Sequence, residues 1–220
     1  MKHIAIILAS GSGSRFGTNI PKQFFSFKGK TVLEHSIEAF QNNNFIDNII
    51  VVCNPDYRSK TVELSKKYSK VINIVNGGET RQQSSYNGVF SVNENNCNVL
   101  IHDAARPFVS NKIINDCIAA LKEHKAVNVA IEATDTIIVV DENNIIKSVP
   151  NRKTLRRCQT PQCFDLNLIK KAHKLAKNDK QFIATDDCGL VIKYNLSPVY
   201  VVKGSEDNIK ITFSSDIKNV

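Results

Sequence analysis

A loop near the start of the chain combines glycines with cations. The segment GSGSRFGTNIPKQ follows an apolar, strand-like run and carries Arg15 and Lys22 after its first glycines. Glycines let backbone N–H groups approach phosphate oxygens closely, and the N-terminus of a following helix adds a favourable dipole. Two cations that converge on such a loop suit a triphosphate whose charge grows as it is attacked. The simpler alternative is a tight strand-to-helix turn with two solvated cations.

The loop does not match the two best-known phosphate-binding patterns. In the dinucleotide-binding pattern GxGxxG a third glycine would follow Gly11 and Gly13, but here Gly17 comes one residue late. The Walker pattern is also missing, because no Gly-Lys-Ser/Thr sequence ends the loop. The missing third glycine and the loop cations disfavour a Rossmann dehydrogenase. The cations favour a nucleotide triphosphate as the molecule that the loop holds.

A carboxylate directly follows another apolar run, in the segment IHDAARPF. Asp103 would lie at the carboxyl end of a parallel strand, where it could hold Mg²⁺, a hard cation that prefers oxygen ligands and phosphate partners. The alternative is that Asp103 and Arg106 only pair with each other. We expect His102 to be a strand residue rather than a ligand.

Three further segments carry polar groups. NGGETRQQSSYNG places two glycines ahead of Arg81, Ser84 and Ser85, and it could receive a base or ribose edge or be only a capped helix start. The segments QTPQCF (Gln159–Phe164) and ATDD (Ala184–Asp187) add hydroxyls and acids at expected element boundaries. None of the three is specific when taken alone.

Alternating strands and helices would bring these side chains together. Apolar, β-branched runs predict strands at Ile4–Ala9, Ile49–Cys53, Val71–Val75, Val99–His102, Val127–Ile131 and Val199–Lys203. Helices are predicted at Val32–Gln41, Lys112–Glu123, Leu166–Lys177 and Asp186–Tyr194. Short apolar strands separated by helices indicate an α/β fold with a mostly parallel sheet and helices on both faces. Such a sheet binds ligands at the carboxyl ends of its strands.

The alternation breaks after Ile131. The segment DTIIVVDENNIIKSVPNR contains two extended runs around the turn-prone Asp141–Asn144, which predicts a β-hairpin. It offers few positions that would pack against the sheet, so we expect a projecting arm. We predict one domain over residues 1–220, with the arm at about 133–152.

Composition limits the class of protein. Of 220 residues, 42% are hydrophobic and 23% charged, as in ordinary globular proteins, and no apolar run approaches the roughly 20 residues that span a bilayer. Only three residues precede the first strand and none suggests a signal peptide, so we expect a cytoplasmic protein without a membrane partner. The six cysteines form no CxxC pair, which favours buried free thiols over disulfides or a zinc site.

The formal charge of +8 raises the question of a nucleic-acid partner. However, the cations are scattered, without a basic block or interleaved aromatic residues. A pocket for a polyanionic small molecule explains an excess of this size equally well. We therefore expect no nucleic-acid partner, while a non-catalytic nucleic-acid-binding protein stays an alternative.

Together these motifs resemble one family, the polyol-phosphate cytidylyltransferases. The family includes the enzymes for 2-C-methyl-D-erythritol 4-phosphate and for ribitol 5-phosphate. The resemblance runs from Ile4 to about Ile217 and is carried by GSGSRFG…PKQ, GGETRQQS…NG, HDAARP, DT, QTPQ, TDD and NIKIT in that order. It implies a Rossmann-like sheet and a homodimer formed through the arm. It also implies that a polyol phosphate attacks the α-phosphorus of CTP and that pyrophosphate leaves.

The resemblance also implies residue roles. The expected catalytic residues are Arg15, Lys22, Arg152 and Lys210. Phosphates would be cradled by Gly11, Ser12, Gly13 and Ser14, and the cytosine and ribose surrounded by Gly78, Arg81 and Ser84. Asp103 would meet Mg²⁺. The polyol phosphate would contact Asp103, Arg106, Thr136, Arg152, Thr160 and Thr185, with Thr136 and Arg152 reaching across the dimer. Ser10, where the family usually has alanine, is expected to be tolerated.

The motifs divide on the acceptor. The methylerythritol enzymes commonly have a lysine soon after the DT pair, whereas this chain continues with isoleucines and a valine, and VPNR and Cys188 resemble the ribitol branch. HDAARP, RQQS and NIKIT resemble the methylerythritol branch and favour 2-C-methyl-D-erythritol 4-phosphate, an isoprenoid precursor. Ribitol 5-phosphate, for cell-wall or capsule polymers, is the alternative. A hexose-1-phosphate nucleotidyltransferase is a more distant one.

Overall fold

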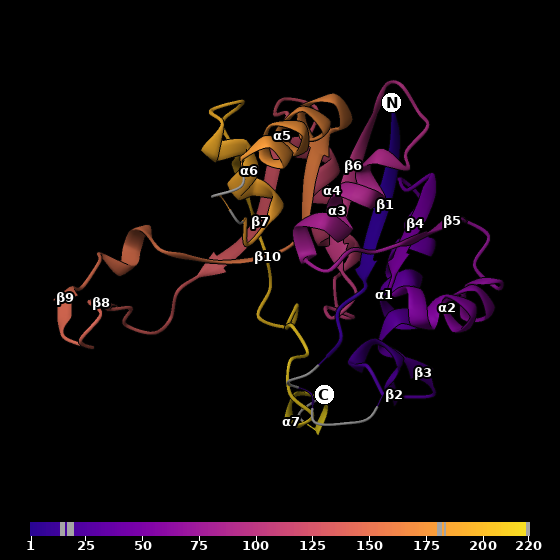
Figure 1. Ribbon diagram of the computed structural model, residues 1–220, viewed down its shortest axis with the longest axis horizontal. Coiled ribbons are helices and arrows are strands. Elements are labelled where there is room, and N and C mark those ends of the chain that lie inside the picture. The colour runs from indigo at the N-terminus through magenta and orange to yellow at the C-terminus, as the bar shows by residue number, and fades with distance from the viewer. Residues whose placement is uncertain (14–15, 17–19, 180–181, 183, 219–220) are drawn as a thin grey trace.

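A seven-stranded sheet forms the centre of the protein. The computed structural model describes residues 1–13, 16, 20–179, 182 and 184–218 (Figure 1). The strands lie in the order β11-β7-β10-β6-β1-β4-β5. Their bounds are β1 Lys2–Ala9, β4 Asn48–Cys53, β5 Val71–Asn76, β6 Cys97–Asp103, β7 Ala126–Glu132, β10 Arg156–Asp165 and β11 Tyr200–Lys203. Among these strands, β10 alone runs antiparallel to its neighbours, so the predicted mostly parallel sheet is confirmed.

Helices cover both faces of this sheet. The longer ones are α1 Val32–Gln41, α2 Arg58–Ser65, α3 Arg81–Phe90, α4 Asn111–Ala120, α5 Leu166–Asn178 and α6 Asp187–Lys193. Successive side chains of a strand point to opposite faces, and β1 shows this directly. Its residues Ala5 and Ile7 pack with α1 and α4, whereas Ile4 and Ile6 pack with α5. Two apolar layers therefore hold β1 at the centre of the molecule.

Short elements complete the chain. They are η2 Lys22–Phe24, β2 Ser26–Phe27, β3 Lys30–Thr31, η3 Pro55–Tyr57, η4 Arg152–Thr154 and α7 Ser215–Lys218. None of the helices in the described ranges combines the length and apolar character needed to cross a membrane. The six cysteines are free thiols; five are buried, as expected, and Cys158 is exposed.

The strand β10 corrects the sequence prediction at Gln159–Phe164. These residues were expected at an element boundary, but they lie inside a ten-residue strand between β6 and β7. Residues 159–164 of the strand are buried although they include Gln159, Thr160 and Gln162. Each of these side chains has hydrogen-bond partners, which offsets the cost of burying it. Its polar composition hid the strand from a search for apolar runs.

The predicted hairpin is present and projects away from the sheet. β8 (Val139–Val140) and β9 (Ile146–Ser148) pair antiparallel at the far end of the arm (Figure 1). The side chain of Asp141 closes the turn, since its Oδ1 accepts the N–H groups of Asn143 and Ile145 at 3.0 and 2.9 Å. Both ends of the arm enter the sheet side by side, where Glu132 of β7 pairs with Arg156 of β10.

Candidate active site

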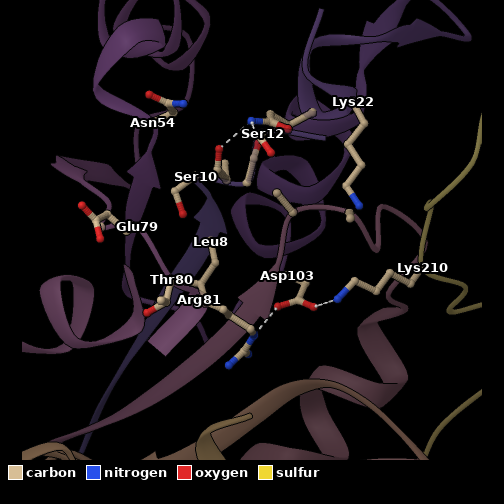
Figure 2. A pocket seen from close by; sticks show the side chains of 16 residues that line it. Leu8, Ser10, Ser12, Lys22, Asn54, Glu79, Thr80, Arg81, Asp103 and Lys210 are labelled. Carbon is tan, nitrogen blue, oxygen red and sulfur yellow. Dashed lines mark hydrogen bonds and ion pairs between the residues drawn. The ribbon is translucent and has the colours of Figure 1, made fainter. Parts of the chain in front are cut away.

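A cavity of about 540 Å³ opens at the carboxyl ends of the parallel strands (Figure 2). β1 and β6 end in Ala9 and Asp103, which line it, and the segments after β4 and β5 contribute Asn54 and Gly78. The full lining is Leu8, Ala9, Ser10, Gly11, Ser12, Lys22, Gln23, Asn54, Gly78, Glu79, Thr80, Arg81, Asp103, Ala104, Ala105 and Lys210. This is the edge at which open α/β sheets bind ligands.

Asp103 lies between two cations on the cavity wall. Its Oδ1 is 3.1 Å from Arg81 Nε and its Oδ2 is 2.7 Å from Lys210 Nζ (Figure 2). Burial alone would raise the pKa of Asp103, but Arg81 and Lys210 hold it well below its usual range. The group is therefore an ionised carboxylate at any physiological pH, and it fixes the two cations beside the cavity.

Behind Arg81 lies a second carboxylate, Asp187, which is 1% exposed. Arg81 Nη1 donates to its Oδ2 at 2.8 Å, and Ser85 Oγ donates to its Oδ1 at 2.5 Å. His173 Nε2 is 3.4 Å from the same Oδ1. Burial opposes ionisation of Asp187, but Arg81 and His173 lower its pKa to about 2. Asp187 thus anchors the guanidinium whose other side holds Asp103.

The side chain of Gln23 in η2 binds the backbone at the start of the glycine loop. Its Nε2 donates to Ala9 O at 2.8 Å and Gly11 O at 2.9 Å, and the side chain is 3% exposed. Gly13 has a φ of +71°, a conformation that favours glycine, and a Cβ there would lie 3.0 Å from Lys22 N. Gly13 and Lys22 therefore lie side by side, and Lys22 lines the cavity, where its Nζ donates to Ile211 O at 2.9 Å.

A capping box positions Arg81 at the first turn of α3. The hydroxyl of Thr80 accepts the N–H of Gln83 at 3.1 Å, and the Gln83 side chain accepts the N–H of Thr80. The preceding glycine pair then approaches other parts of the site closely. A Cβ on Gly77 would lie 2.4 Å from Ser10 Cβ. Only glycine fits there, so the turn brings Gly78 and Ser10 to the same wall of the cavity.

A buried chain of hydrogen bonds supports Asp103 from below. Its backbone N–H donates to Thr160 Oγ1 at 3.1 Å, and Thr160 Oγ1 lies 3.0 Å from His102 Nδ1. His102 Nε2 lies 3.0 Å from Arg106 O. That carbonyl only accepts, so Nε2 carries the proton and Thr160 donates to Nδ1. Burial lowers the pKa of His102 to about 4, which keeps the imidazole ring neutral. The donor and acceptor in each of these hydrogen bonds are therefore fixed.

Comparison with known proteins identifies the family. The family model described as 2-C-methyl-D-erythritol 4-phosphate cytidylyltransferase matches residues 3–220. The chain belongs to this family. It is therefore a cytidylyltransferase, a member of the nucleotidyltransferase class of enzymes.

Individual relatives agree with the family model. A 2-C-methyl-D-erythritol 4-phosphate cytidylyltransferase of Thermobifida fusca is 40% identical, over 97% of this chain and 89% of the relative. A bifunctional ribulose 5-phosphate reductase/CDP-ribitol pyrophosphorylase of Haemophilus influenzae is also 40% identical, over 98% of this chain and 47% of the relative. The crystal structure of 4-diphosphocytidyl-2C-methyl-D-erythritol synthase from Anaerococcus prevotii has a TM-score of 0.88 at 33% identity, covering 99% of this chain and 95% of that one.

The cytidylyltransferase fold gathers about half of the residues predicted from the sequence around one cavity. Those that line it are Gly11, Ser12, Lys22, Gly78, Arg81, Asp103 and Lys210. The alternative, in which Asp103 pairs only with Arg106, is wrong, because Arg81 and Lys210 are the partners of Asp103. Ser14 and Arg15 lie outside the described residues.

The other predicted residues are placed differently. Gly13 shapes the loop, and Ser84 and Thr160 are buried beneath the site. The guanidinium of Arg106 donates to Asn208 O at 2.6 Å and Cys158 O at 3.2 Å, so it braces the segment before Lys210. Thr136, Arg152 and Thr185 are exposed and do not line the cavity. Their roles stay predictions.

Sequence reasoning missed two residues that shape this cytidylyltransferase site. Gln23 belongs to the PKQ motif, but nothing in the sequence shows that its amide clamps two carbonyls of the loop. Asp187 belongs to the TDD motif, where we singled out Thr185 instead. The signal in both cases was a polar residue within a motif of the family, and the buried hydrogen bonds that explain it appear only in the fold.

Proposed function

We propose that the enzyme transfers the cytidylyl group of CTP to 2-C-methyl-D-erythritol 4-phosphate and releases pyrophosphate. One observation carries the proposal: in a chain of this family, Lys22, Arg81 and Lys210 converge with Asp103 on a cavity at the strand ends. The triphosphate would lie beside these cations, and the base and ribose would lie toward Gly78. Lys22 and Lys210 would then neutralise charge that grows on the triphosphate as it is attacked.

The chemistry needs no general base. The acceptor phosphate is already ionised near neutral pH, because its second pKa is about 6. Its oxygen forms a bond to the α-phosphorus while the bond from that phosphorus to the β-phosphate oxygen breaks, and pyrophosphate leaves with the electron pair. The protein's part is to align two anions and neutralise their repulsion. Cations fixed by ion pairs, such as Lys210 on Asp103, do this without reorganising.

The residues present fit a magnesium ion carried by the nucleotide. Among the described residues no three His, Cys, Asp or Glu side chains lie close enough together to hold a metal ion. Asp103 offers one ionised carboxylate on the cavity wall, and Mg²⁺ is commonly bound by one or two carboxylates together with substrate phosphates. We propose Asp103 as the protein ligand. When bound, Mg²⁺ would supply positive charge to the phosphate oxygens.

We further propose that the arm joins two copies of the chain. Its large apolar side chains are between 43% and 62% exposed: Ile137, Ile138, Val139, Val140, Ile145, Ile146 and Val149. An exposed apolar patch of this kind marks an interaction surface. Thr136 and Arg152 lie on or beside the arm and do not line the cavity of their own chain, so a partner's cavity is the place where they could meet the polyol phosphate.

The free thiols support the cytoplasmic location expected from the sequence. Disulfides form and persist in oxidising compartments, whereas the six cysteines of this chain are unpaired.

The decisive experiment is pyrophosphate release with CTP and Mg²⁺, comparing 2-C-methyl-D-erythritol 4-phosphate with D-ribitol 5-phosphate. We expect kcat/KM to be at least about tenfold higher with the first, a difference of about 1.4 kcal/mol. EDTA should abolish the release. A preference for ribitol 5-phosphate would reassign the acceptor, and full activity in EDTA would refute the metal proposal.

Mixing two inactive variants tests the arm in the same assay. In a dimer of Arg152→Ala with Lys22→Ala, one of the two sites combines an intact Lys22 with an intact Arg152 only if Arg152 acts on the partner's cavity. Random exchange of subunits should then restore about a quarter of the wild-type activity. No recovery after proven exchange would place Arg152 in its own subunit's site or remove it from catalysis.

A further inference from the structure

Ser10 lies on the cavity wall, in front of Ser84. Ser84 is 1% exposed and does not line the cavity, whereas Ser10 does. The two hydroxyl oxygens are 2.7 Å apart. The hydroxyl that faces a bound molecule at this point of the wall is therefore that of Ser10, while Ser84 acts from behind it.

The hydrogen bonds around Ser84 fix the direction in which Ser10 points its proton. Ser84 Oγ accepts the backbone N–H of Gly78 at 3.1 Å. Its single proton goes to a carbonyl, either Thr80 O at 2.9 Å or Gly78 O at 3.4 Å. Whichever carbonyl receives it, Ser84 has no proton left for Ser10. In this arrangement Ser10 donates its own proton to Ser84 and offers acceptor lone pairs to the cavity.

The position of Ser10 places that acceptor on the side of the cavity suited to a base. Lys22 and Lys210 lie together on one side, where a triphosphate would find its counter-charges (Figure 2). Asn54 and Glu79 lie on the opposite side, and Ser10 lies between these two residues and the two lysines. A nucleotide whose phosphates meet the lysines would extend its sugar and base past Ser10.

We propose that Ser10 is a specificity residue, whose hydroxyl accepts a hydrogen bond from the 4-amino group of cytosine and so favours CTP over UTP. The proposal rests on the function proposed above, in which CTP fills this cavity. Cytosine presents N–H donors at this position, whereas uracil presents a carbonyl oxygen. An acceptor that meets another acceptor leaves both unpaired and desolvated, which is the costly case for a buried polar group. A hydroxyl free to rotate would serve both bases, so the discrimination comes from Ser84.

Calorimetric titration tests this without the chemical step. CTP and UTP are titrated separately into the wild-type enzyme with Mg²⁺ and no polyol phosphate, and the ratio of the two dissociation constants is the readout. In Ser10→Ala we expect the Kd for CTP to rise about fivefold, the scale of one hydrogen bond. The Kd for UTP should not rise, because the acceptor that faces the uracil carbonyl is removed. In Ser84→Ala the proton of Ser10 is released and can reach uracil, so the Kd for UTP should fall instead.

Ser91→Ala is the matched control. Ser91 follows α3, and its hydroxyl donates to Gly88 O at 2.7 Å, away from the cavity lining. It loses one hydrogen bond as the other variants do, but the CTP to UTP ratio should stay at the wild-type value. Thermal unfolding of each variant confirms that it is folded.

Two outcomes would overturn the inference. If the wild type prefers CTP and Ser10→Ala keeps that preference within twofold, Ser10 does not select the base and the proposed function stands. If the wild type binds neither nucleotide, the proposed function and the role of Ser10 fall together.

Discussion

Asp103 and Asp187 both bond to the guanidinium of Arg81, but only Asp103 lines the cavity. The second partner of Asp103 is Lys210, a side chain that is 40% exposed, so a ligand in the cavity can reach it. The other partners of Asp187 are Ser85 and His173, which are both buried. One carboxylate is thus placed where its cations can be shared with a substrate, and the other is enclosed.

The difference shows how the guanidinium of Arg81 can be held in place by one carboxylate while its charge lies beside the cavity at the other. Asp187 sets the position of Arg81 through a contact that solvent does not reach. Asp103 then holds the charge of Arg81 and Lys210 at the cavity without satisfying either cation completely. We expect variants of both carboxylates to lose stability, and the variant of Asp103 to lose far more activity than stability explains.

The largest effect is expected for Asp103→Asn. The amide keeps the shape of the side chain but loses the charge that holds Lys210 and that would contact Mg²⁺. We expect kcat/KM to fall by at least about 10²-fold, the scale of losing one element of electrostatic preorganisation. Steady-state kinetics measure the loss, and circular dichroism confirms that the variant is folded. Because the lowered pKa of Asp103 also stabilises the fold, urea unfolding should show some loss of stability as well. Activity within fivefold of the wild type would remove Asp103 from the site machinery.

Asp187→Asn should act mainly on stability. It leaves Arg81 without its buried counter-charge, and breaking a buried ion pair from one side costs about 3 kcal/mol of unfolding free energy. Ser85→Ala removes one hydrogen bond to the same carboxylate but keeps the charge, so about 1 kcal/mol is expected. Urea titrations measure both. Equal losses in the two variants would show that the charge of Asp187 contributes nothing.

The stability that Asp187 provides should also depend on acid. The pKa of Asp187 is about 2 in the folded protein, below the value of about 3.9 for an unfolded aspartate. A lowered pKa stabilises the fold above pH 4, and this contribution of about 2 to 3 kcal/mol is lost as the pH falls toward 2. Asp187→Asn should unfold with a weaker pH dependence over that window. Parallel curves for the variant and the wild type would contradict this assignment.

The sequence predicted the part of the fold that is built from apolar strands. β1, β4 and β6 are fully apolar over most of their length, and Asp103 could be placed at the end of β6 for that reason. β10 could not be found in this way, because Gln159, Thr160 and Gln162 are buried by pairing with groups far away in the chain. The same limit applies to Asp187, whose partner Arg81 lies 106 residues earlier.

The site was predictable in its charges and not in its geometry. Family motifs supplied Lys22, Arg81 and Lys210, and the fold brings these three to one cavity. Nothing in the motifs showed that Ser84 is covered by Ser10, because that depends on the close approach of Gly77 to the β1 end. Contacts of this kind are set by distances of a few tenths of an ångström between elements that the sequence places far apart.

The order of strands in the sheet also constrains how the chain can be made. β1, β4, β5 and β6 are complete once Asp103 has been synthesised, but the outer edge of β6 pairs only with β10, which begins at Arg156. While the residues between Asp103 and Arg156 are being synthesised, β6 presents an open row of N–H and C=O groups. Other chains can pair with an edge of this kind. β7 is synthesised before β10 but cannot cover the open edge of β6, because β10 lies between β7 and β6 in the sheet. A ribosome that pauses within the arm would prolong the interval in which the half-built sheet is open to aggregation.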